Sequence, residues 1–145
     1  MGGARTSSAG GGGRYGLFYT AVPNGSEATA SAWLYGLRQD ADNRTNLALV
    51  NVGATASSDT FRIDLYDGAT GQKAGSTDVT VPANGFSQVN AIFATLAPTV
   101  PGGYALITRT SGTNPFIAYA VVNDGGLPGE RSGDGAFVSA SVPAP

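Results

Sequence analysis

Cysteine and histidine are both absent from this chain of 145 residues. The lack of cysteine excludes disulfides and thiolate chemistry, and the lack of histidine removes the most frequent general base and transition-metal ligand. Catalytic sites of the Ser-His-Asp and Cys-His types are therefore excluded. A functional site in this chain has to use carboxylates, hydroxyls, amides, arginines or aromatic rings.

Basic residues are also scarce. Eight Lys and Arg stand against ten Asp and Glu, which gives a formal net charge of −2, and Lys73 is the only lysine. The arginines are spread from Arg5 to Arg131 without a basic cluster, whereas nucleic-acid binding depends on a basic face that contacts phosphates. We therefore expect no nucleic-acid partner.

Long apolar runs are missing too. No stretch approaches the roughly 20 apolar residues of a membrane-spanning helix, so we expect no insertion into a membrane. The first residues, MGGARTSS, lack the apolar segment of a signal peptide. If the protein is exported, we expect its signal sequence to precede this fragment.

The residues that are present favour strands and turns. The chain contains 22 Gly and 8 Pro, a profile that suits short strands joined by tight turns. Residues 1–13 are rich in Gly and Ser with almost no apolar side chains, so we expect a flexible arm or linker there. The length of 14–145 fits a single domain.

Several segments alternate apolar and polar side chains with the period of two that is typical of a β-strand. In 58–67 the apolar Phe61, Ile63 and Leu65 share one face, which we expect to be buried. Turn-forming residues separate the segments at intervals of roughly 8–12 residues. The expected strands are 14–21, 30–37, 43–52, 58–67, 76–81, 86–90, 104–110, 116–123 and 136–142, and 91–96 is expected to form one helical turn.

The sequence therefore predicts an all-β fold, an antiparallel β-sandwich of immunoglobulin-like or jelly-roll type with about nine strands. The glycine-rich segment 67–71 predicts that 58–67 and 76–81 pair as an antiparallel hairpin. In the same way, the turn-forming residues of 111–115 predict that 104–110 pairs with 116–123.

Six ordered blocks of the chain are RYGLFY at 14–19, GLR at 36–38, NRTNLALVNV at 43–52, IDLYDG at 63–68, GFSQVN at 85–90 and FIAYAVVND at 116–124. Together they resemble uncharacterised tandem β-sandwich modules, immunoglobulin-like in kind, of bacterial secreted and cell-surface proteins. The resemblance implies an extracytoplasmic β-sandwich and assigns no chemistry to particular residues. It also implies that ART at 4–6 ends a preceding module.

Acidic residues in turn-like segments offer two chemistries. Paired carboxylates can serve a glycoside hydrolase as acid and nucleophile, and the candidates are Asp40, Asp42, Asp64, Asp124, Glu130 and Asp134. Acidic residues in turns more often bond to their own backbone, so we expect no enzyme. Calcium takes oxygen ligands from loops, and its candidate ligands are Asp40, Asp42 and Asp124. No other cofactor is expected.

Aromatic side chains offer a third kind of site. Trp33, Tyr35 and Tyr66, with Tyr15 and Tyr19, lie in expected strands and can form a platform on which sugar rings stack. Aromatic residues in strands also pack in cores or pair across strands. The exposure of the rings decides between these alternatives.

These observations favour a non-catalytic structural or adhesive module of an exported bacterial protein, secreted or at the cell surface, that can self-assemble into an extracellular array or filament. The expected partners are other protein modules or copies of the chain. The alternatives are a module that binds surface glycans through Trp33, Tyr35 and Tyr66, and a carboxylate-dependent glycoside hydrolase. We expect the arm to be disordered in an isolated monomer and ordered only against another copy or module.

Overall fold

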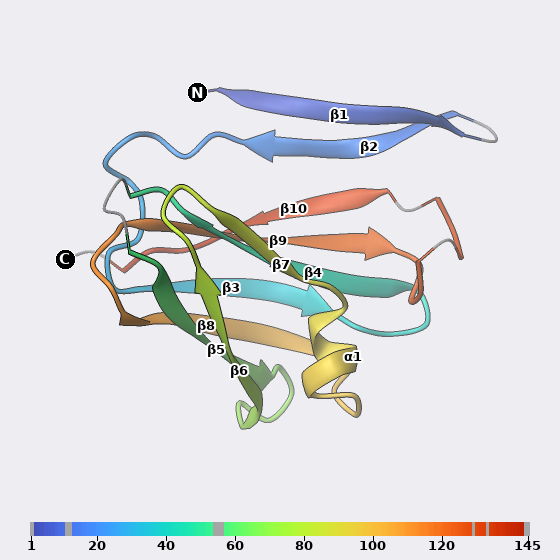
Figure 1. The fold of residues 1–145 in the computed structure, drawn as a ribbon. Helices are drawn as coiled ribbons and strands as arrows, with labels where there is room; N and C mark the ends of the chain where they lie inside the picture. Colours follow the sequence, from blue (N-terminus) through green and yellow to red (C-terminus); the bar gives the residue numbers. More distant parts are fainter. Residues whose placement is uncertain (1, 11–12, 54–56, 129, 133, 144–145) are drawn as a thin grey trace.

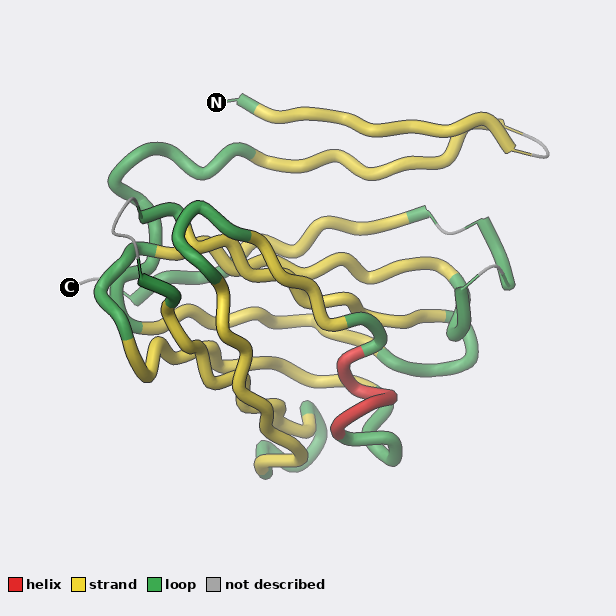
Figure 2. Tube along the Cα trace, viewed as in Figure 1, coloured by secondary structure: helices red, strands yellow, loops and turns green. Residues whose placement is uncertain are grey.

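The computed structural model describes residues 2–10, 13–53, 57–128, 130–132 and 134–143. Two antiparallel four-stranded sheets pack face to face (Figure 1), and the loops gather at the ends of the strands (Figure 2). The fold is therefore the all-β antiparallel sandwich that the sequence predicts. Its elements are β1 (Gly3–Gly10), β2 (Gly13–Thr20), β3 (Ser31–Arg38), β4 (Asn43–Asn51), β5 (Asp59–Asp67), β6 (Lys73–Val81), β7 (Phe86–Val89), α1 (Ile92–Leu96), β8 (Gly102–Ser111), β9 (Phe116–Asp124) and β10 (Gly135–Ser139).

The first sheet has the strand order β3-β8-β5-β6. On the central strand β5, Phe61, Ile63 and Leu65 are fully buried, while the residues between them face outward. Ile63 lies directly opposite Ile107 of β8, which is also fully buried. The period-two pattern of β5 thus predicts the core face of this sheet correctly.

The second sheet has the strand order β10-β9-β4-β7. Leu47 and Leu49 of β4 and Phe116 of β9 are buried in the core. Across the sandwich, the rings of Phe116 and Phe61 lie with their centroids 4.8 Å apart. Side chains from the inner faces of both sheets therefore form one shared core, as in other aligned sandwiches.

Helix α1 closes one end of the sandwich between β7 and β8 (Figure 1). Ile92 and Phe93 of the helix are fully buried. The backbone N–H of Ala91 donates to Oδ1 of Asn46 at 2.9 Å, which fixes the start of the helix to β4. The single helical turn expected at 91–96 is confirmed.

The predicted pairing of 104–110 with 116–123 is wrong, because β8 and β9 belong to different sheets. Their connection crosses the sandwich and is held by the buried Asp59. Asp59 accepts hydrogen bonds from the backbone N–H of Asn114 at 2.8 Å and from its side-chain amide at 3.2 Å. Turn-forming residues alone do not distinguish such an arch from a hairpin. The other predicted hairpin, between β5 and β6, is confirmed.

The segment expected to be a flexible arm forms a strand instead. Gly3–Gly10 pairs antiparallel with β2 along its whole length, whereas residues 1, 11 and 12 of the expected arm lie outside the described residues. Backbone pairing needs no apolar side chains, and β2 supplies an extended partner. The Gly/Ser composition of the arm indicates only that it has little side-chain surface to bury. It does not predict whether the backbone of the arm pairs with another strand.

The β1–β2 hairpin packs beside β10 (Figure 1). The ring of Tyr19 contacts those of Tyr119 and Phe137, with centroid separations of 6.1 and 5.7 Å. The backbone N–H of Gly16 donates to Oδ1 of Asp134 at 2.7 Å. Within the described residues, β2 forms no backbone ladder with either four-stranded sheet. Side chains therefore carry most of the attachment of the hairpin.

Candidate ligand-binding surface

Four aromatic side chains gather on the outer face of the first sheet. Trp33 and Tyr35 come from β3, Tyr66 from β5 and Tyr104 from β8. Leu34, between the two aromatic residues of β3, is fully buried, and the period of two therefore turns its neighbours outward. The register places Tyr66 directly opposite Tyr104. We call these four residues the aromatic cluster.

The rings of the aromatic cluster touch one another. Tyr66 and Tyr104 stack with centroids 5.0 Å apart and an interplanar angle of 5°. Trp33 and Tyr35 are nearly parallel, at 9°, with centroids 6.1 Å apart. The ring of Tyr104 joins the two pairs, since it lies 6.0 Å from Trp33 and 5.9 Å from Tyr35. These contacts fix the rings before any ligand arrives, which lowers the entropy cost of binding.

A β-bulge in β3 sets the position of Tyr35. The register with β8 shifts between Leu34 and Leu37, and Gly36 adopts a φ of 73°, a left-handed conformation that favours glycine. Both leucines consequently point into the core. Tyr35 is left on the outside with 55% of its surface exposed. It is therefore the most accessible member of the aromatic cluster.

Polar groups border the aromatic cluster on the β6 side. Lys73 lies opposite Tyr66 in the register and forms an ion pair with Asp64 at 2.6 Å. The hydroxyl of Ser76 also donates to Asp64, at 2.6 Å. Burial tends to raise the pKa of Asp64, but the bonds from Lys73 and Ser76 outweigh it and hold the pKa below its ordinary value. Asp64 is therefore an ionised acceptor beside the rings.

A second ion pair continues this polar border. Arg62 donates to Asp78 through Nε at 2.5 Å and through Nη2 at 2.9 Å, in a bidentate arrangement. The hydrogen bond and charge of Asp78 raise the pKa of Arg62, and the same bond lowers the pKa of Asp78. Both side chains are largely open to solvent, so the pair offers donors and acceptors to a ligand more than it stabilises the fold.

The outer face of this sheet thus combines ring surfaces with fixed hydrogen-bonding groups. Aromatic rings attract the apolar faces of flat molecules, and an adjacent row of donors and acceptors can bind their hydroxyl groups. Because a sheet face is broad, the arrangement suits an extended ligand. The two carboxylates described beside the rings, Asp64 and Asp78, are paired with Lys73 and Arg62.

The sequence predicts three of the four members of the aromatic cluster. Trp33, Tyr35 and Tyr66 are brought together, whereas Tyr19 packs against the second sheet. Tyr104 was not among the predicted ligand-binding residues. The period of two in the expected strand 104–110 indicates which face of the strand carries Tyr104. Its position beside Tyr66 depends on the order of the strands in the sheet.

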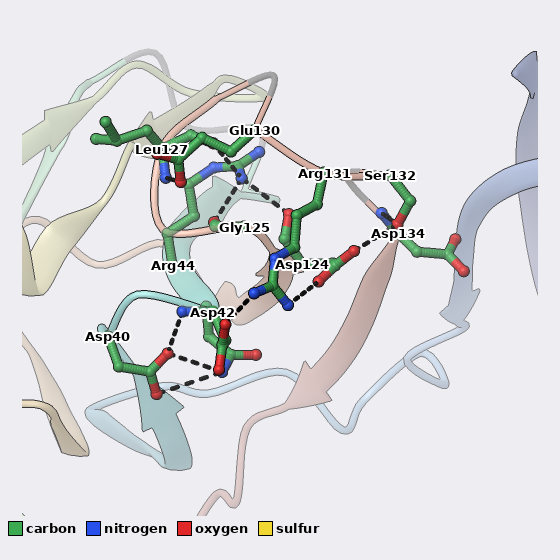
Figure 3. Close-up of polar contacts among 11 residues, drawn as sticks. Asp40, Asp42, Arg44, Asp124, Gly125, Leu127, Glu130, Arg131, Ser132 and Asp134 are labelled. Carbon is green, nitrogen blue, oxygen red and sulfur yellow. Dashed lines mark hydrogen bonds and ion pairs between the residues drawn. The ribbon is translucent and has the colours of Figure 1, made fainter. Parts of the chain in front are cut away.

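Of the carboxylates predicted as calcium ligands, Asp40 and Asp42 lie in the loop between β3 and β4, and Asp124 is the last residue of β9 (Figure 3). Asp42 and Asp124 are brought together, and the guanidinium of Arg131 sits between them, with an ion pair to Asp42 and another to Asp124 at 3.7 Å. Asp40 is engaged separately, because the side chain of Asn43 donates to it at 3.0 Å. That bond, with one from the Asp42 backbone, lowers the pKa of Asp40.

Arg44 organises the same loops. Its Nη1 donates to the backbone carbonyls of Asp124, Gly125 and Leu127 at 3.2, 2.8 and 3.3 Å (Figure 3). Arg44 and Arg131 thus bring positive charge to this site, and Arg38 adds charge beside Asp40. In the part of the chain that the structure describes, no group of three or more acidic side chains is placed to hold a metal ion.

The other carboxylates considered for a hydrolase are also engaged. Glu130 accepts a hydrogen bond from the backbone N–H of Leu127 at 2.8 Å, as expected for an acidic residue in a turn. Asp134 accepts from Gly16 of the β1–β2 hairpin. Asp64 lies on the outer face of the first sheet, beside Lys73. The geometry of these residues is that of structural polar contacts.

Comparisons with models of protein families, with curated proteins and with solved structures found no match to this chain. Among the described residues, no helix has the length and apolar character that a membrane crossing needs. The functional interpretation therefore rests on the residues of this chain alone.

Proposed function

We propose that this protein is a non-catalytic adhesive module of an exported bacterial protein and that it binds carbohydrate through the aromatic cluster. The observation that supports this function best is the continuous contact of four rings from three adjacent strands on an outer sheet face. Large aromatic side chains usually pack in a core or an interface. Their concentration on an outer face supports a binding role.

The polar border supports an uncharged ligand. Its four charged side chains form two pairs of opposite sign, Lys73 with Asp64 and Arg62 with Asp78. The border therefore has no net charge with which to attract a polyanion or a polycation. Sugar rings of a neutral polysaccharide combine apolar faces with hydroxyl groups, and they match both the rings and the border.

The extracytoplasmic location is part of the same proposal. Its support is the resemblance of the six sequence blocks to modules of bacterial secreted and cell-surface proteins, together with a surface suited to a glycan. The absence of both histidine and cysteine from the sequence supports a binding role over a catalytic one. In this proposal the partners are surface glycans and neighbouring protein modules.

Affinity electrophoresis in gels that contain neutral polysaccharides, such as xylan, mannan or a β-glucan, tests the proposed function. We expect at least one of these to retard the protein. Tyr35→Ala and Tyr104→Ala should each weaken binding about thirtyfold or more, because aromatic anchors at the centre of a binding surface are worth about 2 kcal/mol or more.

Phe86→Ala provides the matched control. Phe86 is 56% exposed, close to the 55% of Tyr35, but it lies on β7 of the other sheet. Its replacement should leave the retardation unchanged. Equal mobility in the presence and absence of every neutral polysaccharide would contradict the proposal, as would equal losses from Tyr35→Ala and Phe86→Ala.

A further inference from the structure

The edges of the two main sheets are covered, short or charged. The edge of β3 pairs with Ser141, because the backbone of Trp33 donates to and accepts from that residue at 2.8 Å each. The edge strand β7 has only four residues. The edge strand β6 carries the charged Lys73 and Asp78, and the hairpin packs beside β10. These are devices that limit pairing between sheet edges.

The outer edge of β1 is not paired with any described strand, and Arg5 is its one charged residue. β1 has eight residues, all small except Arg5 and Thr6, with no proline, and the residues described on it are exposed. The carbonyl of Gly2 accepts from the N–H of Ala21 at 2.9 Å. Since bonded pairs alternate along an antiparallel ladder, even-numbered residues bond to β2, and the backbone groups of Arg5, Ser7 and Ala9 face the open edge.

An exposed ring lies near the same edge. Phe18 of β2 is 57% exposed. A Cβ atom at Gly3 would lie only 2.4 Å from its Cζ, so the ring extends over β1 toward the open edge. An apolar ring in this position supplies side-chain contact to a strand that adds to the edge, beyond the backbone hydrogen bonds.

We propose that β1 pairs antiparallel with β1 of a second copy and forms a continuous four-stranded sheet from two hairpins. The two-fold axis passes through Ser7. In this register Arg5 lies opposite Ala9 of the second copy, which keeps the two positive charges apart. In the same register Thr6 lies opposite Ser8 and Ala4 opposite Gly10, so no two bulky side chains meet. The free donors and acceptors of both edges are satisfied together.

A second copy fits this edge better than an unrelated strand because the edge is complementary to itself. Its single charge, on Arg5, avoids its equivalent in the two-fold arrangement. A partner strand with acidic side chains would form an ion pair with Arg5 alone, because β1 has no other charged residue. This interface is separate from the aromatic cluster, so self-association and carbohydrate binding can be measured and can fail independently.

Light scattering coupled to size-exclusion chromatography tests the pairing over a range of concentrations. We expect the mass to rise from 14.5 kDa toward twice that value. Ser7→Pro removes an N–H that faces the open edge, where proline is tolerated, and should keep the protein monomeric. Ser7→Ala retains that N–H and should dimerise like the unaltered protein. A constant monomer mass, or dimerisation of Ser7→Pro to the same extent, would overturn the proposal.

Cross-linking provides a second test that does not depend on a proline. The chain has no cysteine, and directly bonded strand pairs lie about 5.5 Å apart between Cα atoms, within the range of a disulfide. Oxidised Ser7→Cys should therefore give a covalent dimer on a non-reducing gel. Ser26→Cys, at an exposed serine outside β1, is the control. Equal cross-linking of both variants, or none of Ser7→Cys, would exclude the two-fold pairing at Ser7.

Discussion

Replacement of Ile63 with alanine tests the packing of the sandwich core. Ile63 is fully buried on the central strand β5 and lies opposite Ile107. Removing its outer methyl and methylene groups loses their transfer free energy and leaves a cavity between two well-packed sheets. Such a change costs about 2–5 kcal/mol, a large part of the roughly 5–15 kcal/mol of a typical domain.

Urea denaturation followed by fluorescence measures this loss, because Trp33 is the only tryptophan and lies on the same sheet. With a slope of about 2 kcal/mol per molar urea, the midpoint should fall by about 1–2.5 M. Arg62→Ala is the control on the neighbouring, outward position of β5, and it should shift the midpoint much less. Equal shifts for the two variants would refute the assignment of Ile63 to the core.

Two further predictions concern acidic residues. The pKa of Asp64 is held below its ordinary value of 3.8, so its interactions stabilise the fold above that value and lose their effect as the pH falls through the lowered pKa. Lys73→Met should therefore flatten the acid limb of the stability profile, as measured by denaturant midpoints between about pH 5 and pH 2; an unchanged limb would contradict this. We also predict no hydrolysis of polysaccharides, esters or peptides, and turnover by pure protein that is lost in Asp42→Asn or Asp124→Asn would overturn it.

The strands and the core were predictable because each depends on local pattern. Alternation along 58–67 fixes which side of β5 faces inward, and Phe61, Ile63 and Leu65 are buried accordingly. The same pattern turns Trp33 and Tyr35 to one side of β3. A period of two is a property of an extended backbone. The faces of a strand can therefore be predicted without knowing which strands pair with it.

Strand partners were less predictable because they depend on long-range order. Nothing within 111–115 indicates that β8 and β9 separate into two sheets, since the contact that holds their connection comes from Asp59. The membership of Tyr104 in the aromatic cluster likewise requires β8 to lie between β3 and β5. Arg131 is 89 residues from Asp42, and its approach to that carboxylate follows from the pairing of β9 with β4.

The backbone bridge between Trp33 and Ser141 joins the two sheets along one side of the sandwich. The chain leaves β10 of the second sheet and, two residues later, pairs with β3 of the first, so that side is closed as in a barrel. Elsewhere, the side-chain amide of Asn51, at the end of β4, donates to the carbonyl of Val81, at the end of β6, at 3.1 Å and so links the second sheet to the first. The two sheets are thus joined by a pair of backbone hydrogen bonds on the β3–β10 side, whereas the link at the ends of β4 and β6 is made by a side chain that a single substitution can remove.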